Sequence, residues 1–138
     1  PTASSILSGF EKEGILERRK NRNVIEYSAK RDSVIFRDLM LIYWKYRLEK
    51  SGLIERIEKD FIIPVVILFG SASKAELNKD SDIDLAIFSP TKKEIDLTKY
   101  EKKLGRKVQI FMFEKKESVK PPELLNNILN GRIILGSW

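Results

Sequence analysis

Two carboxylates separated by one residue form the clearest chemical signal in the sequence. Asp82 and Asp84 open an apolar segment at 82–88 that has the composition of a buried strand. Alternate side chains of a strand point to the same face, about 6–7 Å apart, so both carboxylates should lie on one side and Ile83 on the other. Paired oxygen ligands suit Mg²⁺, and the chain contains no His or Cys that could bind a metal instead. We therefore expect an oxygen-liganded metal site here.

A glycine-serine turn lies close to this pair in the sequence. Gly70 and Ser71 end a short β-branched segment at 65–69, which predicts a buried strand. Glycine permits a tight turn and Ser is a common N-cap, so we expect a short helix at 72–77 with its free N–H groups at the turn. Such a helix end favours an anion, most often phosphate. A phosphate-binding turn beside two carboxylates predicts a site for Mg²⁺ carrying a nucleoside triphosphate.

The elements around these residues predict an α/β (α+β) domain with a mixed sheet and helices packed on it. Apolar periodicity favours a helix that Gly105 terminates and a third strand in which Gln109 shares a face with two phenylalanines. A proline pair opens a last helix before a final short strand. The expected elements are a helix at 92–104, a strand at 107–113, a helix at 123–129 and a strand at 132–136.

Gly-Ser, ten intervening residues and then Asp-x-Asp resembles the signature of the minimal nucleotidyltransferases of the DNA polymerase beta-like superfamily, archaeal type. The resemblance implies two Mg²⁺ ions and an NTP, with ATP favoured, as substrate. It makes Asp82 and Asp84 both the catalytic residues and the metal ligands. It also implies that the nucleotide is bound by Gly70, Ser71, Lys74 and Ser81.

The sequence departs from that family pattern at two positions. Lys74 stands where the family often has Arg, which retains the charge but loses the bidentate geometry. Gln109 stands where active members usually carry a third acid on a later strand. A neutral amide cannot act as the base for an attacking hydroxyl, although it could orient a water or a substrate. The fold expectation survives this change, and the expectation of activity is weakened.

The N-terminal segment predicts a helix at 2–13 followed by a hairpin at 15–29 with an Asn-rich basic turn. This order resembles the second half of a winged helix-turn-helix domain, with a recognition helix and a wing. The first residue is Pro1, so we expect a piece of a longer chain. The alternative is an ordinary helix and hairpin with solvated charges. The candidate DNA contacts are Ser4, Ser5, Ser8, Arg18, Arg19, Lys20 and Arg22.

A long amphipathic helix is expected at 34–50, followed by a shorter one at 53–60 that should pack on the sheet. The long helix carries two apolar flanks and should therefore be buried on two sides. We interpret it as a core helix that bridges both halves of the chain, and the alternative is a dimer or domain interface. The predicted division is a winged-helix remnant at 1–30, a helical connector at 31–60 and a nucleotidyltransferase domain at 61–138.

Composition limits the functions that remain. The 138 residues carry 26 basic and 20 acidic side chains, a net charge of +6 that permits nucleic-acid binding. No membrane partner is expected, and the absence of Cys fits a cytoplasmic protein. The first hypothesis is an enzyme that transfers AMP to a hydroxyl acceptor, in the manner of an antitoxin that modifies a partner of the helical HEPN type. The alternative is a DNA-binding regulator whose nucleotidyltransferase domain is inactive and either senses nucleotide or forms a homodimer.

Overall fold

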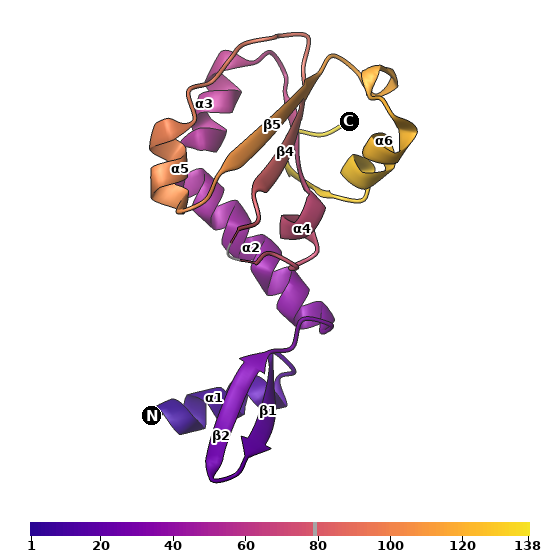
Figure 1. Ribbon diagram of the computed structural model, residues 1–138. Helices are drawn as coiled ribbons and strands as arrows, with labels where there is room; N and C mark the ends of the chain where they lie inside the picture. The colour runs from indigo at the N-terminus through magenta and orange to yellow at the C-terminus, as the bar shows by residue number, and fades with distance from the viewer. Residues whose placement is uncertain (79) are drawn as a thin grey trace.

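The computed structural model describes residues 1–78 and 80–138, and one long helix, α2 (Val34–Ser51), joins the two ends of the molecule (Figure 1). The N-terminal end consists of helix α1 (Ala3–Lys12) and a hairpin of strands β1 (Leu16–Asn21) and β2 (Val24–Ala29). The hairpin strands pair antiparallel across a two-residue turn, as the sequence predicted. No residue of α1 is buried, so this helix has little core of its own.

The C-terminal end is built on a four-stranded mixed sheet with the strand order β5-β4-β3-β6. Strand β3 runs antiparallel to both of its neighbours, whereas β4 and β5 run parallel. The predicted mixed α/β class is therefore confirmed. The bounds of the elements are α3 (Leu53–Asp60), β3 (Val65–Phe69), α4 (Gly70–Ser73), β4 (Ile83–Phe88), α5 (Thr98–Leu104), β5 (Val108–Phe113), the 3₁₀ helix η1 (Lys116–Ser118), α6 (Pro122–Leu129) and β6 (Arg132–Leu135).

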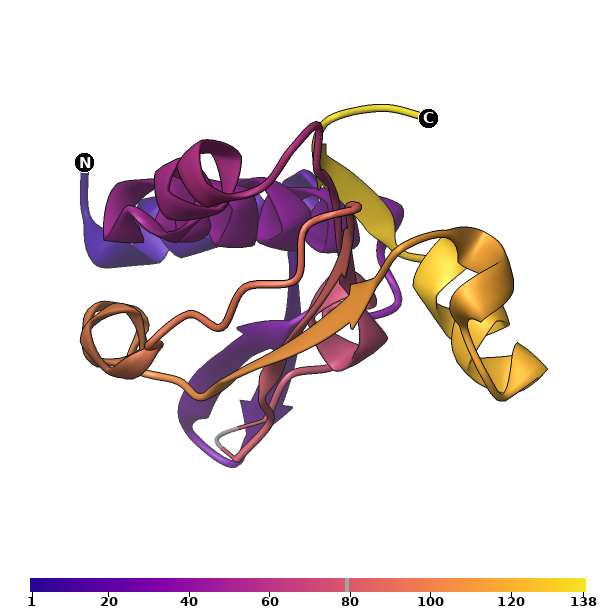
Figure 2. The same ribbon diagram turned by 90° about the horizontal axis from the view of Figure 1, so that it is seen from above.

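Helices cover the two faces of this sheet separately (Figure 2). On one face α2, α3 and α5 pack on Ile83, Leu85 and Ile87 of β4, and these side chains are almost fully buried. On the other face α6 packs on Phe88 and its neighbours. The alternation of β4 side chains between these clusters is the period-two pattern of a strand that is buried on both sides.

Two predicted helices are wrong in their extent. The helix expected at 72–77 is instead the single turn α4, which begins at Gly70. It cannot continue beyond Lys74 because Ala75 adopts a positive φ of 57°. The helix expected at 92–104 begins only at Thr98. The Asp96 carboxylate accepts a hydrogen bond from the Thr98 N–H at 3.0 Å, which forms an Asx-type turn immediately before the helix.

The expectation that α2 is buried on two sides is also wrong. Trp44 and Leu48 are buried against α3, α5 and the sheet, and Met40 is partly buried there. The opposite apolar flank, which includes Ile35 and Ile42, is exposed. The reason is that nothing at the N-terminal end of the molecule folds back over it. By contrast, α3 packs on the sheet through Leu53, Ile54 and Ile57, as predicted.

Across residues 1–78 and 80–138, no helix has the length and apolar character required to cross a membrane.

Candidate metal and nucleotide site

Three polar side chains meet at one end of the central strands. Asp84 lies opposite Phe69 on β3 and opposite Gln109 on β5. Residue alternation places Asp84 and Gln109 on the face covered by α6, because Ile83 and Val108 belong to the other face. Asp82 immediately precedes β4 and shares the side of Asp84. The expectation that the aspartates lie on one side and Ile83 on the other is therefore confirmed.

Gly70 brings the turn after β3 directly against Asp84. Its φ is +68°, a conformation that L side chains rarely adopt, and a Cβ placed on it would overlap Asp84 Oδ2. The glycine is thus required twice, for its backbone conformation and for the space that the carboxylate occupies. The close approach of Gly70 and Asp84 is the strongest structural link between the predicted phosphate turn and the predicted metal ligands.

Gln109 is bonded to the aspartate pair. Its Nε2 donates a hydrogen bond of 2.9 Å to Asp82 Oδ2. Burial raises the pKa of Asp84, and the negative charge of Asp82 raises it further. A divalent cation between these carboxylates would relieve both the desolvation and the repulsion. The amide oxygen of Gln109 can accept a hydrogen bond or contact a cation, but it cannot take up a proton.

The phosphate turn presents two candidate ligand groups. Ser71 lies inside α4 rather than at its N-cap, and within residues 1–78 and 80–138 its hydroxyl has no hydrogen-bond partner. Lys74 follows α4, is exposed, and forms no ion pair within the same residues. Both side chains are thus available to a ligand, and their assignment to nucleotide binding stays a prediction.

The loop before Asp82 is held by its own side chains and by Arg106. The Ser81 hydroxyl donates to Asn78 Oδ1 at 2.9 Å and accepts from the Asn78 N–H at 3.0 Å, so it is already engaged. Arg106 donates to the carbonyl oxygens of Asn78 and Ser81 at 2.6 and 2.9 Å. Its guanidinium also lies 5.5 Å from the ring centroid of Trp44 on α2. Lys79, part of the predicted polar loop, lies outside the described residues.

Arg106 was not identified as a site residue from the sequence. It is separated from the loop by 25 residues or more, and no local pattern signals such a long-range contact. The only local signal is its position immediately after Gly105, which ends α5 in the left-handed conformation. Through its two bonds to carbonyl oxygens, Arg106 holds the loop that leads to Asp82.

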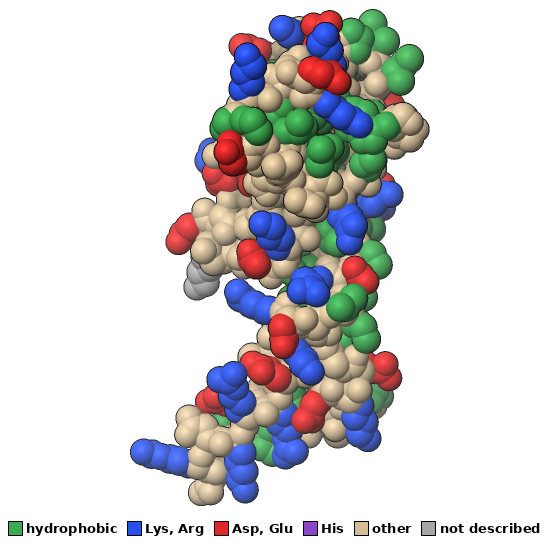
Figure 3. Space-filling model, turned by 90° about the vertical axis from the view of Figure 1, so that its right-hand side faces the viewer, with side chains coloured by type: hydrophobic (Ala, Val, Ile, Leu, Met, Phe, Trp, Pro, Cys, Tyr) green, Lys and Arg blue, Asp and Glu red, His purple; other side chains and the backbone are tan. Residues whose placement is uncertain are grey.

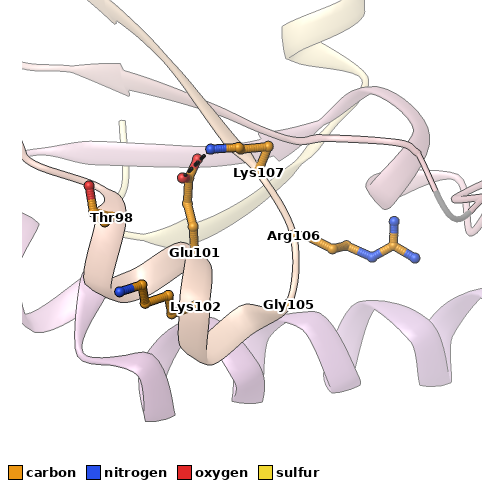
Figure 4. Close-up of a pocket in the computed structure, with 6 residues that line it drawn as sticks. All are labelled: Thr98, Glu101, Lys102, Gly105, Arg106 and Lys107. Carbon is orange, nitrogen blue, oxygen red and sulfur yellow. Dashed lines mark hydrogen bonds and ion pairs between the residues drawn. The ribbon is translucent and has the colours of Figure 1, made fainter.

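A shallow depression of about 360 Å³ lies beside the turn between α5 and β5 (Figure 4). Its Glu101 carboxylate accepts hydrogen bonds from the Val108 N–H and from Lys107 Nζ, both at 3.0 Å. The hydrogen bond from Val108 and that from Lys107 lower the pKa of Glu101. These groups satisfy one another, and none of the predicted site residues lines the depression. The lining residues are Thr98, Glu101, Lys102, Gly105, Arg106 and Lys107.

The predicted DNA contacts lie on α1 and on the β1–β2 hairpin, whereas the aspartates lie at the start of β4. Ser5 closes the first turn of α1, because its hydroxyl donates to the Thr2 carbonyl oxygen at 2.8 Å. Arg19 pairs with Glu17 at 3.1 Å. Arg22 occupies the hairpin turn with a positive φ of 53°. The predicted contacts are Ser4, Ser5, Ser8, Arg18, Arg19, Lys20 and Arg22. The basic side chains among them are exposed, and Ser8 is half-buried. DNA binding by any of these residues stays a prediction.

The donor set fits a magnesium ion held with a nucleotide. Asp82 and Asp84 supply two carboxylates on one side of the sheet, and Gln109 adds a neutral oxygen. Within residues 1–78 and 80–138, no group of three or more acidic, His or Cys side chains is placed to hold a metal. An ion here therefore needs further oxygens, which the phosphates of a bound NTP and water would supply, as is usual for Mg²⁺.

A mixed sheet that joins a glycine-serine turn to an Asp-x-Asp pair defines the class of polymerase beta-like nucleotidyltransferase domains. The family model described as "Polymerase beta, Nucleotidyltransferase" matches residues 51–137, and the chain belongs to this family. The match begins at residue 51 and so includes α3, which the sequence analysis placed in the connector. Comparison with curated proteins returned no match.

Proposed function

We propose that this protein binds an NTP together with Mg²⁺ and transfers its nucleotidyl group to a hydroxyl acceptor. The observation that carries the proposal is the contact between Gly70 and Asp84, which joins the phosphate turn to the carboxylates. Asp82 and Asp84 are the proposed catalytic and metal-binding residues. The family match supports the nucleotidyltransferase class. The magnesium would neutralise phosphate charge, which is the main source of catalysis in such transfers.

The proposed residues have separate roles. The backbone N–H groups at Gly70 and Ser71 and the Ser71 hydroxyl would bind the terminal phosphates, and Lys74 would add a positive charge beside them. Asp82 and Asp84 would fix the metal-bound phosphates against the sheet. Ser81 would act through the loop, since its hydroxyl is engaged with Asn78.

In the transfer, the acceptor oxygen bonds to the α-phosphorus, and the bond from the α-phosphorus to the oxygen bridging to the β-phosphate breaks. Pyrophosphate leaves with that oxygen, and the hydroxyl proton passes to solvent water. Gln109 cannot accept the proton, so we expect a slow enzyme. We propose ATP as the donor and AMP as the transferred group, with a protein hydroxyl, such as one on a HEPN-type partner, as the acceptor.

Gln109 itself favours a second candidate function. Its amide donates to Asp82 in place of a third acid, which leaves a nucleotide-binding site without a base. The alternative is a DNA-binding regulator in which the nucleotidyltransferase domain senses nucleotide. The exposed basic hairpin would then bind phosphate groups of DNA.

The test is labelling with ATP that carries a radioactive α-phosphate. The purified protein and Mg²⁺ are incubated with a cell lysate, and labelled proteins and small molecules are resolved. Asp82→Asn and Asp84→Asn remove one carboxylate each. Asp80→Asn is the matched control, because it removes an exposed carboxylate from the same loop and leaves the pair intact.

Labelled products that require both Asp82 and Asp84 but tolerate Asp80→Asn would support transfer. Magnesium-dependent ATP binding without any labelled product would favour the nucleotide-sensing regulator. Absence of ATP binding would contradict both functions.

A further inference from the structure

The exposed flank of α2 carries a narrow apolar stripe. At 100° per residue, its four members lie within about 60° of one another on the helix surface. Trp44 and Leu48, which face the core, lie on the opposite side of the helix. The stripe is therefore not the edge of the core but a second, separate apolar face. It consists of Ile35, Leu39, Ile42 and Tyr46, all exposed, and Ile42 retains 65% of its accessible surface.

The stripe has the spacing of a helix-pairing seam. Its members follow one another at intervals of four, three and four residues, which is the heptad pattern of two packed helices. Figure 1 shows the first half of α2 crossing the narrow middle of the molecule, and Figure 3 shows hydrophobic side chains among charged ones along this part. A surface this apolar on a helix without a neighbour indicates a contact with another chain.

The charges beside the stripe indicate what that other chain is. Asp38 and Lys45 lie on the same flank of the stripe, two turns apart, and both are exposed. Neither has an ion-pair partner within residues 1–78 and 80–138. When a helix pairs with a copy of itself in antiparallel orientation, a two-fold axis perpendicular to both helices brings identical flanks together. Asp38 of each copy would then lie beside Lys45 of the other.

The apolar and charged residues agree on the same register. A two-fold centre midway between Leu39 and Ile42 differs by one residue, about 1.5 Å, from the centre midway between Asp38 and Lys45. A parallel pair would instead bring that charged flank against the opposite flank, which carries Tyr43 and Lys50. The pairing of Asp38 with Lys45 is thus specific to the antiparallel orientation.

We propose that the exposed stripe of α2 pairs with the same stripe of a second copy of this chain, forming an antiparallel homodimer. The contact lies on the side of α2 away from the nucleotidyltransferase core, so the proposal does not depend on nucleotide binding. A specific interface usually buries about 800 Å² on each partner, and four side chains cover less than this. We therefore expect dissociation at micromolar concentrations.

The test measures mass in solution by sedimentation over about 1–300 μM protein, a range set by the expected affinity. The chain should approach about 32 kDa, twice its 16.0 kDa, at the upper end. Ile42→Glu should leave a monomer throughout. Ile63→Glu is the matched control, because Ile63 is 85% exposed and lies outside the stripe, and it should leave the dimer intact.

Charge reversal tests the orientation. Asp38→Lys alone and Lys45→Asp alone should each raise the dimer dissociation constant about tenfold, since each places like charges across the seam. The double variant Asp38→Lys/Lys45→Asp should restore the dissociation constant of the wild type. A wild-type chain that stays monomeric at about 300 μM, a dimer that survives Ile42→Glu, or a double variant no better than the single ones would overturn the proposal. Circular dichroism checks that each variant is folded.

Discussion

Substitution of Gly70 by Ala probes the contact that joins the two halves of the site. The left-handed backbone costs an L-residue about 1–2 kcal/mol. The added Cβ would also overlap Asp84 Oδ2, and overpacking of this kind costs about 1–3 kcal/mol more. Gly70→Ala should therefore lower the free energy of unfolding by about 2–5 kcal/mol.

Gly105 supplies a closely matched control. Its φ is also +68°, but no atom lies within 4 Å of the position that a Cβ would take. Gly105→Ala should therefore cost only the backbone contribution of about 1–2 kcal/mol. The difference between the two variants, measured by urea unfolding followed by circular dichroism, isolates the overlap with Asp84.

A double-mutant cycle attributes that difference to the carboxylate. In the Asp84→Ala background, Gly70→Ala should cost no more than Gly105→Ala, giving a coupling of about 1–3 kcal/mol between residues 70 and 84. If Gly70→Ala and Gly105→Ala cost the same within about 0.5 kcal/mol, and the coupling is zero, then the turn does not pack against Asp84 as described.

Three further variants test other parts of the site. Burial raises the pKa of Asp84 above its ordinary 3.8. The protonated carboxyl therefore stabilises the fold at pH values below 3.8, and this stabilisation is lost as the pH rises through the raised pKa. Asp84→Asn should therefore have a higher melting temperature than wild type at neutral pH without Mg²⁺, and the gain should vanish near pH 3.5; equal melting temperatures at neutral pH would contradict this. Arg106→Lys should weaken Mg-ATP binding by about tenfold in calorimetry, because it loses the two loop carbonyl contacts. Substitution of the exposed Lys102 of α5 by Ala should leave binding unchanged, and equal effects of the two variants would show that Arg106 does not position the loop. Gln109→Asp should raise the number of Mn²⁺ ions bound per chain from about one to about two, as measured by electron paramagnetic resonance. An unchanged number would show that residue 109 does not limit metal binding.

The strands and the faces of the aspartates could be predicted because they depend on local patterns. β4 alternates between two cores, so the period-two rule places Asp82 and Asp84 on one side without knowledge of the neighbouring strands. The same rule placed Gln109 on a face with two phenylalanines. The β-branched residues 65–69 and the glycine that ends them identified the turn.

The contacts that complete the site depend on tertiary structure and could not be predicted in this way. The approach of Gly70 to Asp84 follows from the register of β3 and β4, which the sequence does not encode locally. The reach of Arg106 to the loop of Asn78 requires the parallel pairing of β4 and β5 to be known. The exposed stripe of α2 was misinterpreted as core, because apolar periodicity indicates a buried face without indicating which chain buries it.

Calorimetric titration of Mg-ATP shows whether Asp82 and Asp84 form a magnesium-dependent nucleotide site with the Gly70 turn. We predict binding to the wild type and to Asp80→Asn that disappears when Mg²⁺ is chelated, and a loss of about tenfold or more in affinity for Asp82→Asn and Asp84→Asn. Binding that is independent of magnesium, or unchanged in both aspartate variants, would contradict the proposed site.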